Sequence, residues 1–312
     1  MLAGLEKRVD PELLSSFQII PSRVRELHAD KVRVLWCQNL PEDPGIDNAL
    51  KNQGWKQFHR IVFVSNWQMQ HYIERYAIAW DRCALLQNAI EPIPTHKKPS
   101  DRIKLVYMST PQRGLDVLYY VFKQIPDDDI HLEVFSSFKL YGWPQADQPY
   151  EPLFDQLRND SRVTYHGSQD NDFVRAAIQD CHIFAYPSTW KETSCICLME
   201  AMSARLLCVH PDLAALPETA SNTTTMYHWD PDKSKHASIF LEVLKAAIAT
   251  VRKSSAIHQA QLDTQKSYAD KFYSWDPRAA QWTALLKSIK GMAREFEKVD
   301  APKPTLTFSY RV

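Results

Sequence analysis

Short apolar runs alternate with amphipathic stretches along most of the chain. Runs typical of buried strands occupy 17–22, 32–37 and 60–65, and the sequence NWQMQHYIERYAI, at 66–78, has helical spacing. Proline, lysine and histidine then interrupt the pattern in EPIPTHKKPSD, at 91–101, which predicts a domain linker. The chain is therefore expected to form two parts on either side of this linker.

The same alternation resumes after the linker. The predicted strands there are 103–109, 130–137, 162–168, 183–188, 206–211 and 223–229. Successive βα units with nearly continuous apolar strands form parallel sheets covered by helices on both faces. We therefore expect an α/β fold with two Rossmann-like domains, whose ligands bind beyond the carboxyl ends of the strands.

Composition argues against several kinds of partner. The 37 lysines and arginines balance 37 aspartates and glutamates, which gives no support for a nucleic-acid partner. No apolar run approaches the roughly 20 residues of a membrane span, and the opening MLAGLEKRVDPELL lacks the apolar core of an export signal. Six scattered cysteines without a C-x-x-C pair predict reduced thiols, a cytoplasmic location and no bound metal.

Residues 186–202, YPSTWKETSCICLMEAM, contain two glutamates where a predicted strand passes into a helix. Thr193 or Ser194 is predicted to cap that helix, whose free N–H groups would bind a diphosphate. Glu192 before the helix and Glu200 inside it could then contact hydroxyls at two ends of a nucleoside diphosphate sugar. The alternative is that both carboxylates are ordinary solvated groups, but the apolar neighbours of Glu200 make this costly.

The longer segment 186–218, YPSTWKETSCICLMEAMSARLLCVHPDLAALPE, resembles the donor-binding signature of the retaining glycosyltransferases of family GT4. The resemblance covers most of 60–290 and implies the GT-B fold, in which two Rossmann-like domains with parallel sheets face each other across a cleft. It implies a shortened N-terminal acceptor-side domain over 1–95 and a nucleotide-sugar donor-binding domain over 96–268. A C-terminal helix that returns towards the first domain, with a tail, would occupy 269–312.

The resemblance also implies roles for single residues. Glu192 would contact the transferred sugar and support its developing positive charge, and Glu200 would hold the ribose. Arg113, in YMSTPQRGLDVL, would grip the diphosphate, for which an arginine offers fixed charge and a two-pronged contact. Glu192 and Arg113 are thus the predicted catalytic residues. The remaining predicted donor-binding residues are Ser109, Thr110, Gly114, Ser136, Ser137, Gly167, Thr193, Ser194, Cys195 and Ile196.

The motif departs from the family pattern at two places. Thr193, Ser194 and Cys195 stand where the family usually has Gly-Phe-Gly, and their side chains are expected to narrow the sugar pocket. Arg205 stands where a glycine commonly ends the helix, and its charge could interact favourably with the helix dipole.

The predicted first domain offers few acceptor-side residues. Gly4 matches a glycine of the loop and helix that meets the diphosphate in the family. Gln38 and Asn39 follow a predicted strand at a place where a histidine often faces the sugar, and His28 and His59 are alternatives.

These features predict a retaining hexosyltransferase that uses no cofactor or metal. It would move a hexose-type sugar from a nucleoside diphosphate sugar to a hydroxyl acceptor on a saccharide or glycoconjugate. The acidic run PDDDI, at 126–130, is interpreted as a turn and not as a metal-binding motif. Three alternatives stay open: a sugar-nucleotide epimerase or hydrolase, a non-catalytic module that binds nucleotide sugar or glycan, and a glycosyltransferase acting on nucleic-acid bases.

Overall fold

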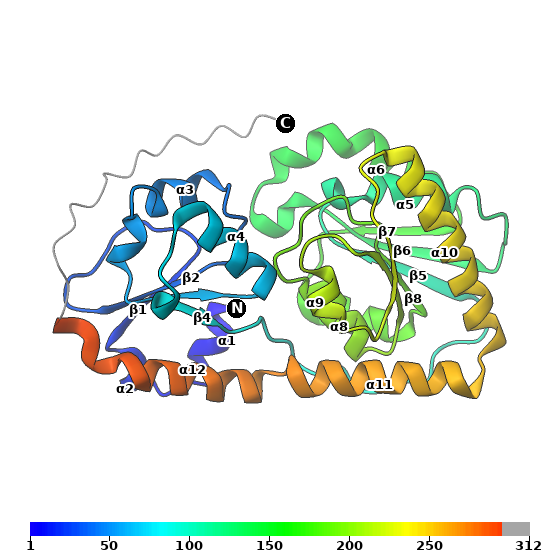
Figure 1. Cartoon of the computed structure of the whole chain (residues 1–312). Helices are drawn as coiled ribbons and strands as arrows, with labels where there is room; N and C mark the ends of the chain where they lie inside the picture. Colours follow the sequence, from blue (N-terminus) through cyan, green and yellow to red (C-terminus); the bar gives the residue numbers. More distant parts are fainter. Residues whose placement is uncertain (295–312) are drawn as a thin grey trace. The chain divides into compact units, whose positions relative to one another are not determined.

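The computed structural model describes residues 1–294 as two compact units, each built on its own parallel sheet (Figure 1). One unit contains Met1–Ala89 together with the described chain from Trp275 onwards, and the other contains Ile90–Ser274. Two parallel-sheet α/β units are the predicted fold class, which is confirmed. The predicted tail after the last helix lies outside the described residues.

The first unit has a four-stranded sheet in the order β1–β2–β3–β4. Its strands are β1 (Phe17–Pro21), β2 (Val32–Trp36), β3 (Arg60–Phe63) and β4 (Cys83–Leu85). Its helices are α1 (Leu2–Glu6), α2 (Pro11–Leu14), α3 (Pro44–Leu50), α4 (Asn66–Tyr76) and α12 (Trp275–Ile289). Two separate apolar cores cover the sheet, one formed with α1, α2 and α12 and the other with α3 and α4.

Helix α12 completes the first of these cores. The rings of Trp36 in β2 and Trp282 in α12 meet edge to face, with centroids 4.8 Å apart, and both side chains are buried. The N-terminal sheet therefore depends on a helix from the far end of the chain for one of its two covering layers.

The second unit has a six-stranded sheet in the order β10–β9–β8–β5–β6–β7, parallel throughout. Its strands are β5 (Ile103–Met108), β6 (Ile130–Phe135), β7 (Val163–Gly167), β8 (Ile183–Ala185), β9 (Leu207–Pro211) and β10 (Thr225–Tyr227). Its helices are α5 (Leu115–Phe122), α6 (Glu151–Asn159), α7 (Asn171–Ala177), α8 (Ile196–Ser203), α9 (Leu216–Ala220), α10 (Lys233–Lys253) and α11 (Ala256–Phe272). The chain runs outwards from β5 to β7 and then returns to β8, so the order reverses between β5 and β8. Ligands of such sheets bind at this reversal, beyond the carboxyl ends of the strands.

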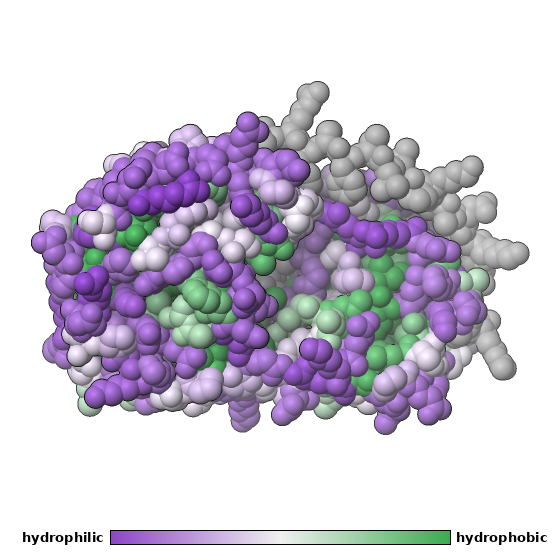
Figure 2. Space-filling view, turned by 180° about the vertical axis from the view of Figure 1, so that it is seen from behind, coloured by the Kyte–Doolittle hydropathy of each residue, from purple (hydrophilic) through white to green (hydrophobic). Residues whose placement is uncertain are grey.

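All nine strands predicted from the sequence are present. Strand β4 was not predicted; it has three residues, all of them half-buried. On the face shown in Figure 2, hydrophilic residues cover most of the surface and hydrophobic residues form small patches. Within residues 1–294, no helix combines the length and the apolar character that a membrane crossing requires.

Candidate active site

Three loops of the second unit begin at neighbouring positions of its sheet. They follow β5, β6 and β8, which are adjacent and parallel, so all three start at the same carboxyl edge. These loops, 109–114, 136–143 and 186–195, contain most of the donor-binding residues predicted from the sequence.

The centre of this edge is an ion pair between the two predicted catalytic residues. Nη1 of Arg113 lies 2.7 Å from Oε1 and 3.0 Å from Oε2 of Glu192, whose side chain is only 6% exposed. The hydroxyl of Tyr186 donates a second hydrogen bond to Oε1, at 2.5 Å. Burial is the strongest single influence on Arg113 and opposes its charge, but the neighbouring groups, Glu192 first among them, together outweigh burial and raise the pKa of the arginine well above its ordinary value. Arg113 is therefore held charged in a largely buried place.

The backbone of these loops is also held in place. The carbonyl oxygen of Glu192 accepts a hydrogen bond of 3.0 Å from the N–H of Ala215, in the loop after β9. The guanidinium of Arg113 lies over the ring of Trp190, 5.7 Å from its centroid. Trp190 is 39% exposed and was not among the predicted site residues.

Gly114 allows the loops after β5 and β8 to approach closely. Its φ of +108° lies in the region that side chains disfavour, and an added Cβ would stand 2.2 Å from the carbonyl oxygen of Pro187. A glycine is therefore required here both for the backbone conformation and for the close contact.

Buried polar atoms without a hydrogen-bond partner gather in the same three loops. Of eleven such side-chain atoms in residues 1–294, five lie there: Thr110 Oγ1, Gln112 Oε1, Arg113 Nε, Ser136 Oγ and Ser194 Oγ. Buried polar groups of folded proteins are nearly always hydrogen-bonded, so this concentration marks a place where a polar ligand would supply the missing partners. Gln112 was not predicted, although it lies directly before Arg113 in the quoted motif.

The loop after β6 contributes one serine to this edge and uses the other internally. Ser137 donates a hydrogen bond of 2.5 Å to Asp147 and accepts one of 3.0 Å from the N–H of Lys139, so its hydroxyl shapes the loop itself. The N–H of Ser136 bonds to the carbonyl oxygen of Gly167 at 3.0 Å, and Gly167 has a φ of +65°. Ser136 and Gly167 are thus adjacent at the ends of β6 and β7.

Helix α8 starts later than predicted. It begins at Ile196, with Cys195 at the N-cap position and no side-chain cap, so the prediction that Thr193 or Ser194 caps it is wrong. The preceding loop is fixed by the contacts of Glu192, which leave the hydroxyl of Ser194 buried and unpartnered instead of directed at the helix. Burial raises the pKa of the Cys195 thiol well above its ordinary value, so the start of α8 carries no thiolate.

Glu200, the fifth residue of α8, has a partner that the sequence did not reveal. Its Oε1 lies 3.1 Å from Nη1 of Arg175 in α7, and Nη2 of that arginine bonds to the carbonyl oxygen of Glu91 at 2.8 Å. Burial raises the pKa of Glu200 above its ordinary value, and Arg175 partly opposes this shift. The only signal for Arg175 was its place in the helical stretch DFVRAAIQDC, which says nothing of where the side chain points.

The predicted acceptor-side residues lie in the first unit. Gly4 is inside α1, where an added Cβ would come within 2.3 Å of the ring of Trp275, so this glycine permits helix packing. Gln38 exchanges two amide hydrogen bonds of 3.1 Å with Asn88, which is 2% exposed. The alternative residue His59 is buried, and its Nδ1 accepts a hydrogen bond of 2.9 Å from the N–H of Arg33.

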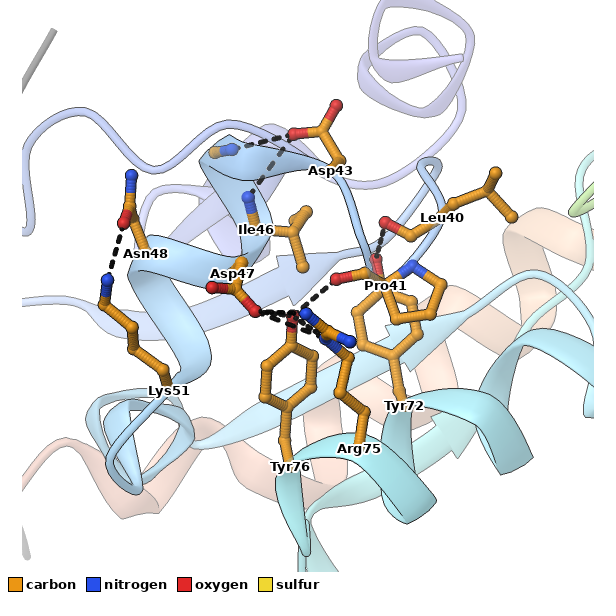
Figure 3. Close-up of polar contacts among 11 residues, drawn as sticks. Leu40, Pro41, Asp43, Ile46, Asp47, Asn48, Lys51, Tyr72, Arg75 and Tyr76 are labelled. Atoms are coloured by element: carbon orange, nitrogen blue, oxygen red, sulfur yellow. Dashed lines mark hydrogen bonds and ion pairs between the residues drawn. The ribbon is translucent and has the colours of Figure 1, made fainter. Parts of the chain in front are cut away.

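The loop after β2, which carries Gln38 and Asn39, is bonded to α4 at Leu40 and Pro41, and Figure 3 shows these two contacts. The hydroxyl of Tyr72 donates to the carbonyl oxygen of Asn39 at 3.0 Å, and that of Tyr76 donates to Pro41 at 2.5 Å. The amide of Asn39 donates to Asp43 at 2.9 Å. Hydrogen bonds to α4 and within the loop therefore hold Gln38 and Asn39, the polar residues after β2, in a fixed loop.

The acidic run PDDDI and the basic residue Arg205, both noted in the sequence, have structural roles. The run PDDDI leads into β6 through a turn, as interpreted, and Asp127 and Asp129 both accept hydrogen bonds from Arg252. Arg205 adopts a φ of +57°, the conformation for which glycine is favoured, and its side chain pairs with Asp263 at 2.7 Å. Within the described part of the chain, no group of three or more His, Cys, Asp or Glu side chains could hold a metal ion.

Comparison with known families decides the class of the protein. The family described as Glycosyl transferases group 1 matches residues 91–246, half of the chain and most of the second unit. The chain belongs to this family. No curated protein matches its sequence.

Several solved structures share the fold of this family member. A glycosyltransferase from Rickettsia africae ESF-5 aligns with a TM-score of 0.70 at 14% identity, covering 93% of this chain and 81% of that one. The Anabaena protein Alr3699/HepE, solved in complex with UDP-glucose, aligns with a TM-score of 0.67 at 14% identity over 83% and 72% of the two chains. Sucrose-phosphate synthase from Thermosynechococcus elongatus aligns with a TM-score of 0.63 at 14% identity over 83% and 68%. The fold of this glycosyltransferase is therefore the GT-B fold.

Proposed function

We propose that this glycosyltransferase moves a hexose-type sugar from a nucleoside diphosphate sugar to a hydroxyl of a saccharide or glycoconjugate, with retention of configuration and without a bound metal. The observation that carries the proposal is the group of buried, unpartnered polar atoms around the Arg113–Glu192 pair, at the reversal of strand order.

The diphosphate would lie between Arg113 and the start of α8. Arg113 is held charged, and its Nε has no hydrogen-bond partner. The first N–H groups of α8 have no side-chain cap and carry the positive end of the helix dipole. Together they supply the fixed positive charge that a departing diphosphate requires, which is why no metal is proposed.

The two glutamates would contact the two ends of the donor. Glu200, further along α8, would accept hydrogen bonds from the ribose hydroxyls, and Glu192 from a hydroxyl of the sugar. In the transfer step the bond between the sugar C1 and the diphosphate oxygen breaks, and the electron pair leaves with the diphosphate. The carboxylate of Glu192 stabilises the positive charge that develops on the sugar ring.

The acceptor hydroxyl would attack C1 on the face that the diphosphate is leaving. Its proton passes to an oxygen of the departing phosphate, so the products are the glycosylated acceptor and the free nucleoside diphosphate. This step needs no further acid or base from the protein, and the anomeric configuration is retained.

A panel of nucleotide sugars tests the proposal, with nucleotide release and thermal stability as the measurements. UDP-glucose is the first donor to try, because the related Anabaena protein was solved with it. We expect at least one donor to stabilise the protein and to be turned over. Glu192→Ala should abolish transfer while UDP still binds, and Glu242→Ala, which removes an exposed glutamate of α10, should leave transfer unchanged. If no nucleoside diphosphate sugar stabilises the protein, the proposed donor site is wrong.

A non-catalytic nucleotide-sugar module is a second candidate, favoured by one observation. Both oxygens of Glu192 already accept hydrogen bonds from Arg113, and one of them also from Tyr186, within the protein itself. Stabilisation by UDP-sugars without any turnover, across a range of saccharide acceptors, would support this candidate. Release of an altered free sugar would instead indicate an epimerase or hydrolase.

A further inference from the structure

Two side chains donate the hydrogen bonds described above to the carboxylate of Glu192: Arg113 and Tyr186. The ring of Tyr186 is fully buried, and its hydroxyl lies 2.5 Å from Oε1. We propose that Tyr186 is the positioning residue of Glu192: its hydroxyl keeps the carboxylate oriented while Arg113 binds the diphosphate. The proposal rests on the proposed function, because it assumes that a diphosphate competes for Arg113.

Arg113 would be shared between two anions when a diphosphate binds. In the structure its Nη1 bonds to both oxygens of Glu192. A diphosphate carries more negative charge than a carboxylate and would draw the guanidinium towards itself. Glu192, whose side chain is 6% exposed, would then be held less firmly by its cation. A buried carboxylate in this position needs a further hydrogen-bond donor to keep its orientation.

Tyr186 is suited to be that donor. Burial, followed by the charge of Glu192, raises the pKa of Tyr186 well above its ordinary value, so the phenol keeps its proton at neutral pH. Because this proton is directed at Glu192, the hydroxyl of Ser109, 3.5 Å from the phenol oxygen, is the donor to Tyr186. Ser109, assigned to donor binding from the sequence, thus also contributes to the orientation of Tyr186.

Contacts within the sheet hold Tyr186 in position. It directly follows β8, and its N–H bonds to the carbonyl oxygen of Val209 in β9 at 2.9 Å. Its ring stacks on that of Phe184 with centroids 5.2 Å apart and lies 5.8 Å from that of Tyr107. Arg113, in contrast, stands on a loop with its Nε unpartnered. When the arginine changes partner, the tyrosine stays in place.

Tyr107 provides a matched control. It is equally buried, and its hydroxyl also makes a hydrogen bond, to the carbonyl oxygen of Thr110 at 2.9 Å. Tyr107→Phe and Tyr186→Phe each remove one buried hydroxyl and keep the ring. Only the second removes a donor from Glu192, so a difference between the two variants reports on that carboxylate and not on packing.

The first measurement is steady-state kinetics over a range of pH with the donor that the wild type uses. Tyr186→Phe should lower kcat about 10- to 100-fold, the loss expected for one hydrogen bond to a charged group, with the KM for donor nearly unchanged. The acidic limb of its kcat profile should move to higher pH, because Glu192 in the donor complex is more easily protonated. Tyr107→Phe should show neither change. Equal kcat and equal acidic limbs in the two variants would overturn the proposal.

The second measurement does not require turnover. In protein labelled with ¹³C at glutamate carboxyl carbons, the Glu192 resonance is identified by its absence in Glu192→Gln. Titrated with UDP present and absent, this resonance should change at higher pH in Tyr186→Phe than in Tyr107→Phe. If the wild type transfers no sugar, the proposed function fails while this titration still decides the role of Tyr186. Coincident titration curves for Tyr186→Phe and Tyr107→Phe would refute the proposed role of Tyr186 even if the enzyme is active.

Discussion

The buried ion pair between Arg113 and Glu192 predicts opposite responses to UDP in two single variants. Glu192→Ala leaves a guanidinium that is 21% exposed without its carboxylate. Removing one partner of a buried pair costs about 3–5 kcal/mol, and the partial exposure of Arg113 points to the lower end, about 3 kcal/mol. For a domain of this size about 1 kcal/mol corresponds to roughly 2–4 °C, so the melting temperature of the second unit should fall by roughly 6–12 °C.

Saturating UDP should then reverse part of this loss. A diphosphate that reaches Arg113 supplies the negative charge that the variant lacks, so UDP should raise the Tm of Glu192→Ala more than that of the wild type. In Arg113→Ala the diphosphate has lost its cation, and the shift with UDP should be smaller than in the wild type.

Differential scanning fluorimetry with and without UDP measures all three proteins, and Glu242→Ala serves as the control for losing a glutamate at an exposed site. Two results would refute the reasoning. If Glu192→Ala melts within about 1 °C of the wild type, the pair contributes little to stability. If Arg113→Ala and the wild type respond equally to UDP, Arg113 does not contact the diphosphate.

Three further predictions concern other parts of the second unit. Gly114→Ala should lower the free energy of unfolding, measured by urea titration, by more than about 2 kcal/mol. Gly142→Ala should lower it less, because Gly142 has a φ of +72° but no atom lies within 4 Å of an added Cβ. Equal losses in the two variants would mean that the close contact at Gly114 is unimportant. Arg175→Ala removes the cation beside Glu200 and should weaken UDP binding about tenfold by calorimetry, and an unchanged Kd would show that Glu200 needs no such partner. Burial lowers the pKa of His210 to about 4, so the folded protein keeps this side chain neutral while the unfolded chain protonates it near pH 6.5. Stability is therefore lost as the pH falls from about 6.5 to 4, and His210→Gln should remove up to about 3 kcal/mol of that loss; identical pH dependence of the urea midpoint would contradict this.

Much of the fold was predictable because its strands are strongly marked. Parallel strands covered on both faces are continuous apolar runs, which a single sequence displays. Strand β4, Cys83–Leu85, is half-buried and three residues long, and nothing in its composition separates it from a loop. Burial does not separate β4 from the predicted strands, because β7 and β10, which were predicted, are also largely half-buried or exposed.

The candidate site was predictable only in its local parts. One motif shows the spacing of Glu192 and Glu200, and it also places the first before a helix and the second inside it. Their partners are not: Arg113 is 79 residues away from the first, and Arg175 is 25 residues away from the second. Tyr186 lay inside the quoted motif, but the path of the loop, and not the spacing, brings its hydroxyl to Glu192.

The division of the chain into units has a consequence for its synthesis. Residues Ile90–Ser274 are contiguous, so the second unit can fold as soon as it has left the ribosome. The N-terminal sheet is made first but receives α12 last, and until then the face of β2 that carries Trp36 lacks the ring of Trp282. During translation the nascent chain therefore exposes an unfinished apolar surface for as long as the whole second unit takes to emerge. We expect the time needed to synthesise the second unit, and not the stability of the completed protein, to determine how strongly the chain depends on chaperones.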